Sequence, residues 1–149
     1  MNISKTKIAI LIPKKIEFKK SLIRNIILEL AKELQFSIAS INVSFVDKKE
    51  ILELNSKYLN HHTSTDILTF NYSGSNTFLD GEIIISYEDA VENALRFHIT
   101  GHEEYLRLII HGLLHLLGYD DHEKSDKLKM KRKETSLVKK LNYLVLNKI

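Results

Sequence analysis

The sequence predicts an α+β fold in which helices cover a small mixed four-stranded sheet. Segments with strand and helix patterns alternate along the chain, but one pair of predicted strands is joined only by the short turn-rich stretch SGSNT at residues 73–77. The 149 residues contain no internal repeat, low-complexity tract or proline-rich linker, and this length is typical of one domain. We therefore expect a single domain over residues 1–149.

The first half of the chain is expected to contribute two strands and two helices. The apolar run KIAILI at residues 7–12 predicts the first strand, and apolar side chains at helical spacing predict an amphipathic helix over residues 16–35. Apolar and polar residues alternate over residues 40–46, which is typical of a half-buried strand. Asp47 is then a suitable N-terminal cap for a helix over residues 48–59.

The second half of the chain contributes two further strands and three helices. We predict strands at residues 66–72 and 78–86, and helices at residues 87–98, 102–117 and 124–146. The helix over residues 102–117 is rich in leucine and isoleucine, and Gly118 marks its C-terminal end.

Composition limits the chemistry available to the chain. There is no cysteine, which excludes disulfides, thiolate metal sites and cysteine nucleophiles. The apolar run near the N-terminus, IAILI, is too short for a signal peptide or a membrane span. We therefore expect a cytoplasmic protein with no membrane partner.

The charge pattern allows two interpretations. The net charge is +3, and lysine is abundant over residues 123–149. Such a segment is typical of a surface that faces RNA or the ribosome, but also of a solvated helix face. Because +3 is modest, charge alone favours the solvated face.

The stretch HGLLHLLGYDDH at residues 111–122 carries the strongest functional signal. His111 and His115 are four residues apart on one helix, so both imidazoles point the same way and can chelate one ion. After the turn at Gly118, either Asp121 or His122 can provide the third ligand to the same ion. Three protein ligands and an open position are typical of a catalytic metal site, where bound water becomes nucleophilic.

Two other interpretations of these histidines are weaker. A single histidine on an apolar helix is more often a hydrogen-bonded core residue, but a pair with this spacing and a third candidate ligand favours a metal. A peptidase of the zinc-protease type needs a glutamate directly after the first histidine, and Gly112 occupies that position here.

These residues resemble a known family. HGLLHLLGYDDH closely resembles the signature of the YbeY family of single-strand-specific, metal-dependent endoribonucleases. LNSKYLNHHTSTDILTF (54–70) and FLDGEIIIS (78–86) are similar to two further blocks of that family. The resemblance implies processing of the 3′ end of small-subunit ribosomal RNA and ribosome quality control, with single-stranded or ribosomal RNA and the ribosome or ribosomal proteins as partners. It also implies one Zn²⁺ per chain, with Mn²⁺ or another divalent ion as alternatives.

The sequence departs from the family pattern at two positions. Where the family has its third histidine, this chain has Asp121, and His122 follows. The spacing to the last helix favours Asp121, and both residues are kept as candidate ligands. Leu59 stands where the family usually has an arginine that could grip a phosphate, and no lysine or histidine nearby reproduces a guanidinium fork.

The resulting hypothesis is hydrolysis of single-stranded RNA. We expect His111 and His115 to act in catalysis as metal ligands, together with Asp121 or His122. Candidate substrate-binding residues, which would neutralise the RNA backbone, are Lys57, His61 and His62. Asp66 is a candidate to orient the site by hydrogen bonding, or else a loop cap.

Two questions stay open in the sequence. Asp120 is as plausible a turn residue as it is a general base. The alternative function is that of a non-catalytic ribosome assembly factor whose metal is structural.

Overall fold

A four-stranded mixed sheet forms the centre of the protein. The computed structural model describes residues 6–59 and 65–146. The strands are β1 (Lys7–Leu11), β2 (Ser37–Val46), β3 (Ile67–Asn71) and β4 (Phe78–Ser86). Their order in the sheet is β1-β2-β4-β3, with β1, β2 and β4 parallel and β3 antiparallel to β4. The predicted α+β fold with a small mixed sheet is therefore confirmed.

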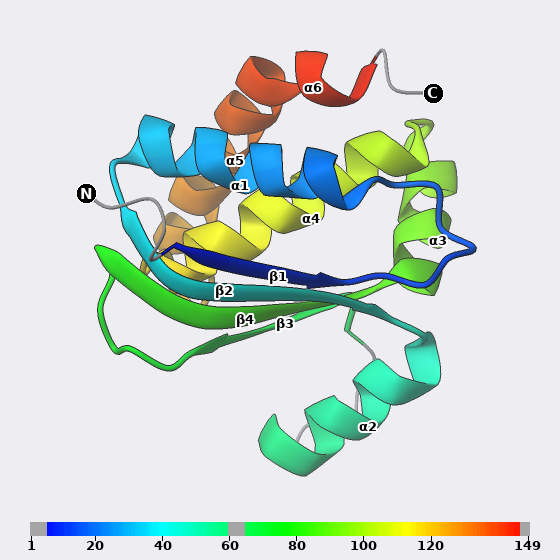
Figure 1. The fold of residues 1–149 in the computed structure, drawn as a ribbon, viewed down its shortest axis with the longest axis horizontal. Coiled ribbons are helices and arrows are strands. Elements are labelled where there is room, and N and C mark those ends of the chain that lie inside the picture. Colours follow the sequence, from blue (N-terminus) through cyan, green and yellow to red (C-terminus); the bar gives the residue numbers. More distant parts are fainter. Residues whose placement is uncertain (1–5, 60–64, 147–149) are drawn as a thin grey trace.

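Helices cover the two faces of the sheet unequally. They are α1 (Lys20–Leu34), α2 (Lys48–Leu59), α3 (Tyr87–Phe97), α4 (Gly101–Leu116), α5 (Lys124–Leu141) and α6 (Tyr143–Leu146). Figure 1 shows α1, α4 and α6 stacked over one face, with α5 behind them, whereas α2 alone lies under the other face. Within the described residues, no helix is both long and apolar enough to cross a membrane.

The elements begin and end close to the predicted residues, with two differences. Helix α1 begins at Lys20 rather than at residue 16. The single helix expected over residues 124–146 is divided at Asn142 into α5 and α6. Asparagine has a lower helix propensity than the lysine and leucine residues that precede it.

The main hydrophobic core lies between the sheet and the helices of the α1 and α4 side. Its fully buried side chains include Ile23, Ile27, Ile41, Ile83 and Ile109. Helix α2 is attached to the opposite face by a much smaller buried cluster, Val46, Ile51, Leu68 and Ile84. The larger core therefore determines the position of α4, which carries the two histidines.

Gly112 allows α4 to approach the sheet closely. A Cβ atom at this position would lie 2.9 Å from Ile83 Cγ2 and 3.1 Å from Ile67 Cδ1. Both neighbours are β-branched side chains of the sheet, so they have little freedom to move aside. The residue after the first histidine is therefore glycine for packing reasons, and a glutamate there has no room in this structure.

We expect Gly112→Ala to destabilise the protein. Overpacking of a core costs about 1–3 kcal/mol, and the better helix propensity of alanine offsets about 1 kcal/mol of this. The net loss in the free energy of unfolding should be on the order of 1 kcal/mol in urea unfolding. Gly101→Ala is the matched control, because nothing lies within 4 Å of a Cβ atom there. A variant Gly112→Ala as stable as Gly101→Ala would contradict this account.

Candidate metal centre

Helix α4 is buried on every side except one narrow strip. Between residues 104 and 116, the only side chains that are not buried are Arg107, His111 and His115. Each is four residues from the next, so the three lie in one row along the helix. Each of these three side chains is 23–24% exposed to solvent. The most buried helix of the fold thus presents one cationic and two imidazole side chains to a single opening.

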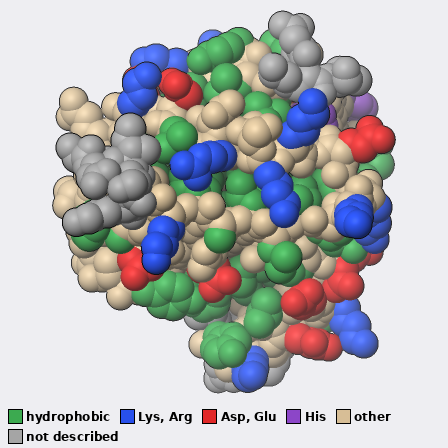
Figure 2. All heavy atoms as spheres, viewed as in Figure 1, with side chains coloured by type: hydrophobic (Ala, Val, Ile, Leu, Met, Phe, Trp, Pro, Cys, Tyr) green, Lys and Arg blue, Asp and Glu red, His purple; other side chains and the backbone are tan. Residues whose placement is uncertain are grey.

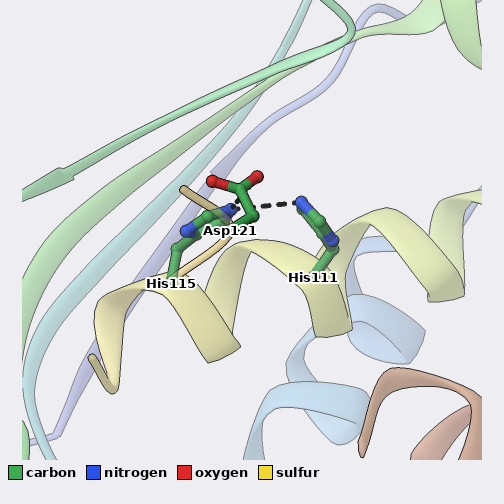
Figure 3. Close-up of side chains that lie close together, drawn as sticks. All are labelled: His111, His115 and Asp121. Atoms are coloured by element: carbon green, nitrogen blue, oxygen red, sulfur yellow. Dashed lines mark hydrogen bonds and ion pairs between the residues drawn. The ribbon is translucent and has the colours of Figure 1, made fainter. Parts of the chain in front are cut away.

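The two imidazoles face each other across this opening. His111 Nε2 and His115 Nε2 are 3.2 Å apart, and the rings meet edge to face with centroids 4.7 Å apart. The carboxylate of Asp121 joins them, with its Oδ2 atom 3.7 Å from His115 Nε2 (Figure 3). One ligand atom from each of the three residues lies within 4.8 Å of the other two. This spacing suits donors that share one ion.

The turn after α4 brings Asp121 to the histidines. Gly118 has a φ angle of +100°, which favours glycine, and the chain reverses there. The backbone N–H groups of Gly118 and Tyr119 donate to the carbonyl oxygens of His115 and Leu114 at 3.0 Å. These bonds close the helix end, so the following residues return over the last turn of α4.

Glu134 of α5 holds His111 from behind. Its side chain is 3% exposed, and Oε1 lies 2.6 Å from His111 Nδ1. With Nδ1 donating its proton to this carboxylate, Nε2 keeps a lone pair that faces His115 and Asp121. A carboxylate behind a metal-binding imidazole fixes both the tautomer and the ring orientation.

The electrostatics favour the neutral form of His115. Burial lowers the pKa of His115 below its usual 6.5, and the nearby His111 lowers it further, against the opposing effect of Asp121. For Glu134, burial acts to raise the pKa, but His111, Arg107 and Lys131 outweigh it, so the pKa is lowered. A neutral imidazole beside an ionised carboxylate is the donor chemistry that a divalent ion requires.

Arg107 gathers the surrounding carboxylates into one network. Its guanidinium donates to Glu104 Oε1 and Oε2 at 2.8 and 2.6 Å and lies 3.5 Å from Glu134 Oε2. Asp66 Oδ2 is 3.9 Å away, and the amide of Asn93 donates to both Asp66 and Glu104. Asp66 therefore joins the site through Arg107 rather than by contact with a histidine.

Sequence patterns did not predict a role in the site for Arg107, Glu104 or Glu134. Arg107 could have been found, because it precedes His111 by the same four residues that separate the two histidines. Glu134 carries no such signal, since its contact with His111 depends on how α5 packs against α4.

Other predicted site residues lie apart from the imidazole pair. The side chain of His122 is 85% exposed, and its Nε2 atom lies 3.5 Å from Asp120 Oδ1. Asp120 Oδ1 also accepts the backbone N–H of His122, a contact typical of a turn residue. Lys57 belongs to α2, where its ammonium lies 5.2 Å from the centre of the Tyr58 ring. His61 and His62 lie outside the described residues.

Comparison with known proteins places this arrangement in a family. The family model for the endoribonuclease YbeY matches residues 4–142. The chain belongs to the YbeY family. A YbeY relative from Flavobacterium psychrophilum, named Endoribonuclease YbeY, is 43% identical over 103 residues, covering 69% of this chain and 73% of the relative. A relative of the same name from Chlorobium limicola is 37% identical over 118 residues, covering 79% of this chain and 81% of the relative.

A solved structure also matches the YbeY fold described above. The solution structure of TM1509 from Thermotoga maritima aligns with a TM-score of 0.62 at 32% identity. The alignment covers 90% of this chain and 88% of that protein. The resemblance to YbeY predicted from the sequence is thus confirmed.

We expect Asp121, rather than His122, to contribute to metal affinity. Asp121→Asn should weaken Zn²⁺ binding by at least about tenfold, because a neutral amide oxygen replaces a charged ligand. His122→Ala should leave the affinity unchanged, since its exposed ring lies near Asp120 and Asp121 in a second, fully exposed group that contains neither histidine of α4. Titration of the metal-free protein with Zn²⁺ in a competitive chelator assay measures both. A larger loss from His122→Ala would reverse the assignment.

We also expect Glu134→Gln to weaken Zn²⁺ binding, by about 10–100-fold, because it removes the charged acceptor behind His111. Asp126→Asn is the matched control, since Asp126 is an exposed carboxylate on the same helix. The same competitive titration applies, and thermal unfolding of the metal-free variants separates a weakened site from a weakened fold. Equal affinities for the two variants would exclude a role for Glu134 in positioning His111.

Proposed function

We propose that this chain is a metal-dependent endoribonuclease that hydrolyses phosphodiester bonds in single-stranded RNA. Membership of the YbeY family indicates a nuclease. The observation that carries the proposal is the convergence of His111, His115 and Asp121 at one opening of a buried helix. The proposal covers residues 1–149 as one metallo-hydrolase domain.

The donor set fits one divalent ion. His111 and His115 would be neutral nitrogen ligands, and Asp121 an oxygen ligand. When bound, the ion would polarise a phosphate oxygen and lower the pKa of water. We propose Zn²⁺, with Mn²⁺ or another divalent ion as alternatives, because a carboxylate in place of a third imidazole also suits harder ions.

The chain's own residues would prepare the site for this chemistry. Glu134 keeps the proton of His111 on Nδ1, so its Nε2 lone pair remains available. Burial of His115 keeps its imidazole unprotonated near neutral pH. Arg107, already paired with Glu104, holds the carboxylate of Glu134 in place from the other side.

The biological setting belongs to the same proposal. By analogy with the family, we infer that the chain acts in the cytoplasm on the 3′ end of small-subunit ribosomal RNA and in ribosome quality control. The ribosome or its proteins are the proposed partners. Lys57, His61 and His62 are proposed to neutralise the RNA backbone.

We expect the protein to cleave single-stranded RNA only when a divalent ion is present. EDTA should abolish cleavage, and added Zn²⁺ or Mn²⁺ should restore it. His115→Ala should lower the rate by at least about 100-fold, because removal of a ligand exceeds the usual effect of altering a residue behind one. Gel analysis of a labelled single strand beside a duplex of the same sequence provides the measurement.

A different result would support the alternative function. If the metal-loaded protein binds the single strand but never cleaves it, the chain is a ribosome assembly factor with a structural ion. Circular dichroism of His115→Ala is needed beside the assay, so that an unfolded variant is not counted as an inactive one.

A further inference from the structure

Helix α5 is much more basic than the small net charge of the whole chain suggests. This helix contains eight of the 22 lysine and arginine residues but only two of the 19 aspartate and glutamate residues. Its formal charge is therefore +6, and the rest of the chain carries −3. The modest total of +3 is the difference between a strongly basic helix and a mildly acidic remainder.

Three lysines of α5 stand at the edge of the candidate metal centre. Lys124, Lys127 and Lys131 follow one another at intervals of three and four residues, so they share a face of the helix. A pocket of about 620 Å³ is lined by these lysines together with Arg107, His111, Asp121, Leu128, Met130 and Glu134. The face that carries the lysines thus opens onto two of the three proposed metal ligands.

A shallower and more open depression continues along the same helix. A second pocket of about 650 Å³ is lined by α5 alone, with Lys131, Arg132, Thr135, Ser136, Lys139 and Lys140. Lys131 borders both pockets, so they follow one another along the helix. An α-helix of 18 residues is about 27 Å long, which is enough for several nucleotides of an extended strand.

Some of these cations are already paired, and others are available. Lys131 lies 3.3 Å from Glu134 Oε2, and Lys140 pairs with Glu33 of α1. Within residues 6–59 and 65–146, neither Lys124 nor Lys127 forms an ion pair. By contrast, Figure 2 shows blue and red side chains intermixed on the face formed by α1 and β1. Two lysines without an ion pair in this part of the chain therefore border the pocket that contains His111 and Asp121.

We propose that the groove along α5 binds the backbone of single-stranded RNA and leads it to the metal centre. Lys124 and Lys127 neutralise phosphates next to the bond to be cleaved, and Arg132 binds the strand further along. Leu128, which is 52% exposed and lines the same pocket, offers an apolar surface for a base. A basic groove that follows the backbone is the usual means of binding single strands without sequence preference.

This inference rests on the proposed function, and it accounts for one departure of the sequence from its family. The arginine expected at the last residue of α2 is Leu59 here. A row of lysines on α5 supplies positive charge at the edge of the candidate metal centre from a different element. The lysine ammonium is a compact charge and does not bind a phosphate through two fixed hydrogen bonds, as the arginine guanidinium does. This less directional contact suits a strand that moves through the groove.

The salt dependence of RNA binding tests the groove. Each phosphate contact to a single strand contributes about −0.7 to the slope of log K against log salt concentration. The double variant Lys124→Gln/Lys127→Gln should therefore bind with a slope shallower by about 1.4, and about tenfold or more weakly near 0.1 M salt. Its matched control is Lys14→Gln/Lys20→Gln, which removes the same charge from exposed positions near the start of α1.

Binding is measured by fluorescence anisotropy of a labelled RNA of about 12 nucleotides, from about 50 to 200 mM salt. EDTA is present, so no strand is cut. The control pair should keep the slope of the unaltered protein. Equal changes in both pairs, or no change in the α5 pair, would overturn the proposal. RNA binding is measured here without metal, so it does not depend on cleavage. A protein that never cleaves RNA would refute the proposed function, but the salt slopes of the α5 variants would still show whether α5 binds RNA.

Two further measurements distinguish an RNA-binding groove from a membrane-binding helix. In the metal-loaded enzyme, the α5 pair should raise KM for a single strand while kcat is retained. Vesicles containing anionic lipid are the competing partner for a basic helix. If the α5 pair loses vesicle binding but keeps the RNA slope, the surface serves a membrane and the proposal is wrong.

Discussion

The burial of α4 is the constraint on which the rest of the structure depends. Two strands and four other helices contact this helix, and from residue 104 to residue 116 they leave only Arg107, His111 and His115 partly open. The hydrophobic free energy of packing its other side chains is therefore what holds the two imidazoles in one orientation. A ligand pair on an exposed helix would lack this preorganisation, because the helix itself would be free to shift.

The buried carboxylates behind the histidines are neutralised by cationic side chains. Glu104 and Glu134 are almost inaccessible to water, and an isolated carboxylate in such a place would be strongly destabilising. One guanidinium contacts both of them, and His111 and Lys131 contact Glu134 as well. The network joins α4 to α5 and, through Asp66, to the start of β3. The residues that orient the proposed ligands thus also connect the elements that surround them.

Sequence patterns predicted the helices and strands well, because apolar spacing reports directly on which face of an element is buried. They also predicted that His111 and His115 converge with Asp121 or His122, because these residues are close in the chain and joined by one helix turn and one glycine turn; the structure brings Asp121 to the two histidines. They did not identify Glu134, whose contact with His111 arises only when α5 packs on α4. The groove along α5 was likewise hidden, since lysine-rich segments look alike whether they face solvent or a site. The division at Asn142 was missed because the apolar pattern continues through it.

The single open row on α4 also restricts how this part of the chain can vary in length. Each residue added to a helix rotates everything after it by about 100° relative to everything before it. An insertion between Arg107 and His111 would therefore turn both imidazoles toward the packed interior while leaving the guanidinium outside. A deletion would have the same effect with the opposite sense of rotation. The rotational phase of α4 thus forbids insertions and deletions in this segment, even though nearly any apolar side chain of similar volume would satisfy its buried faces.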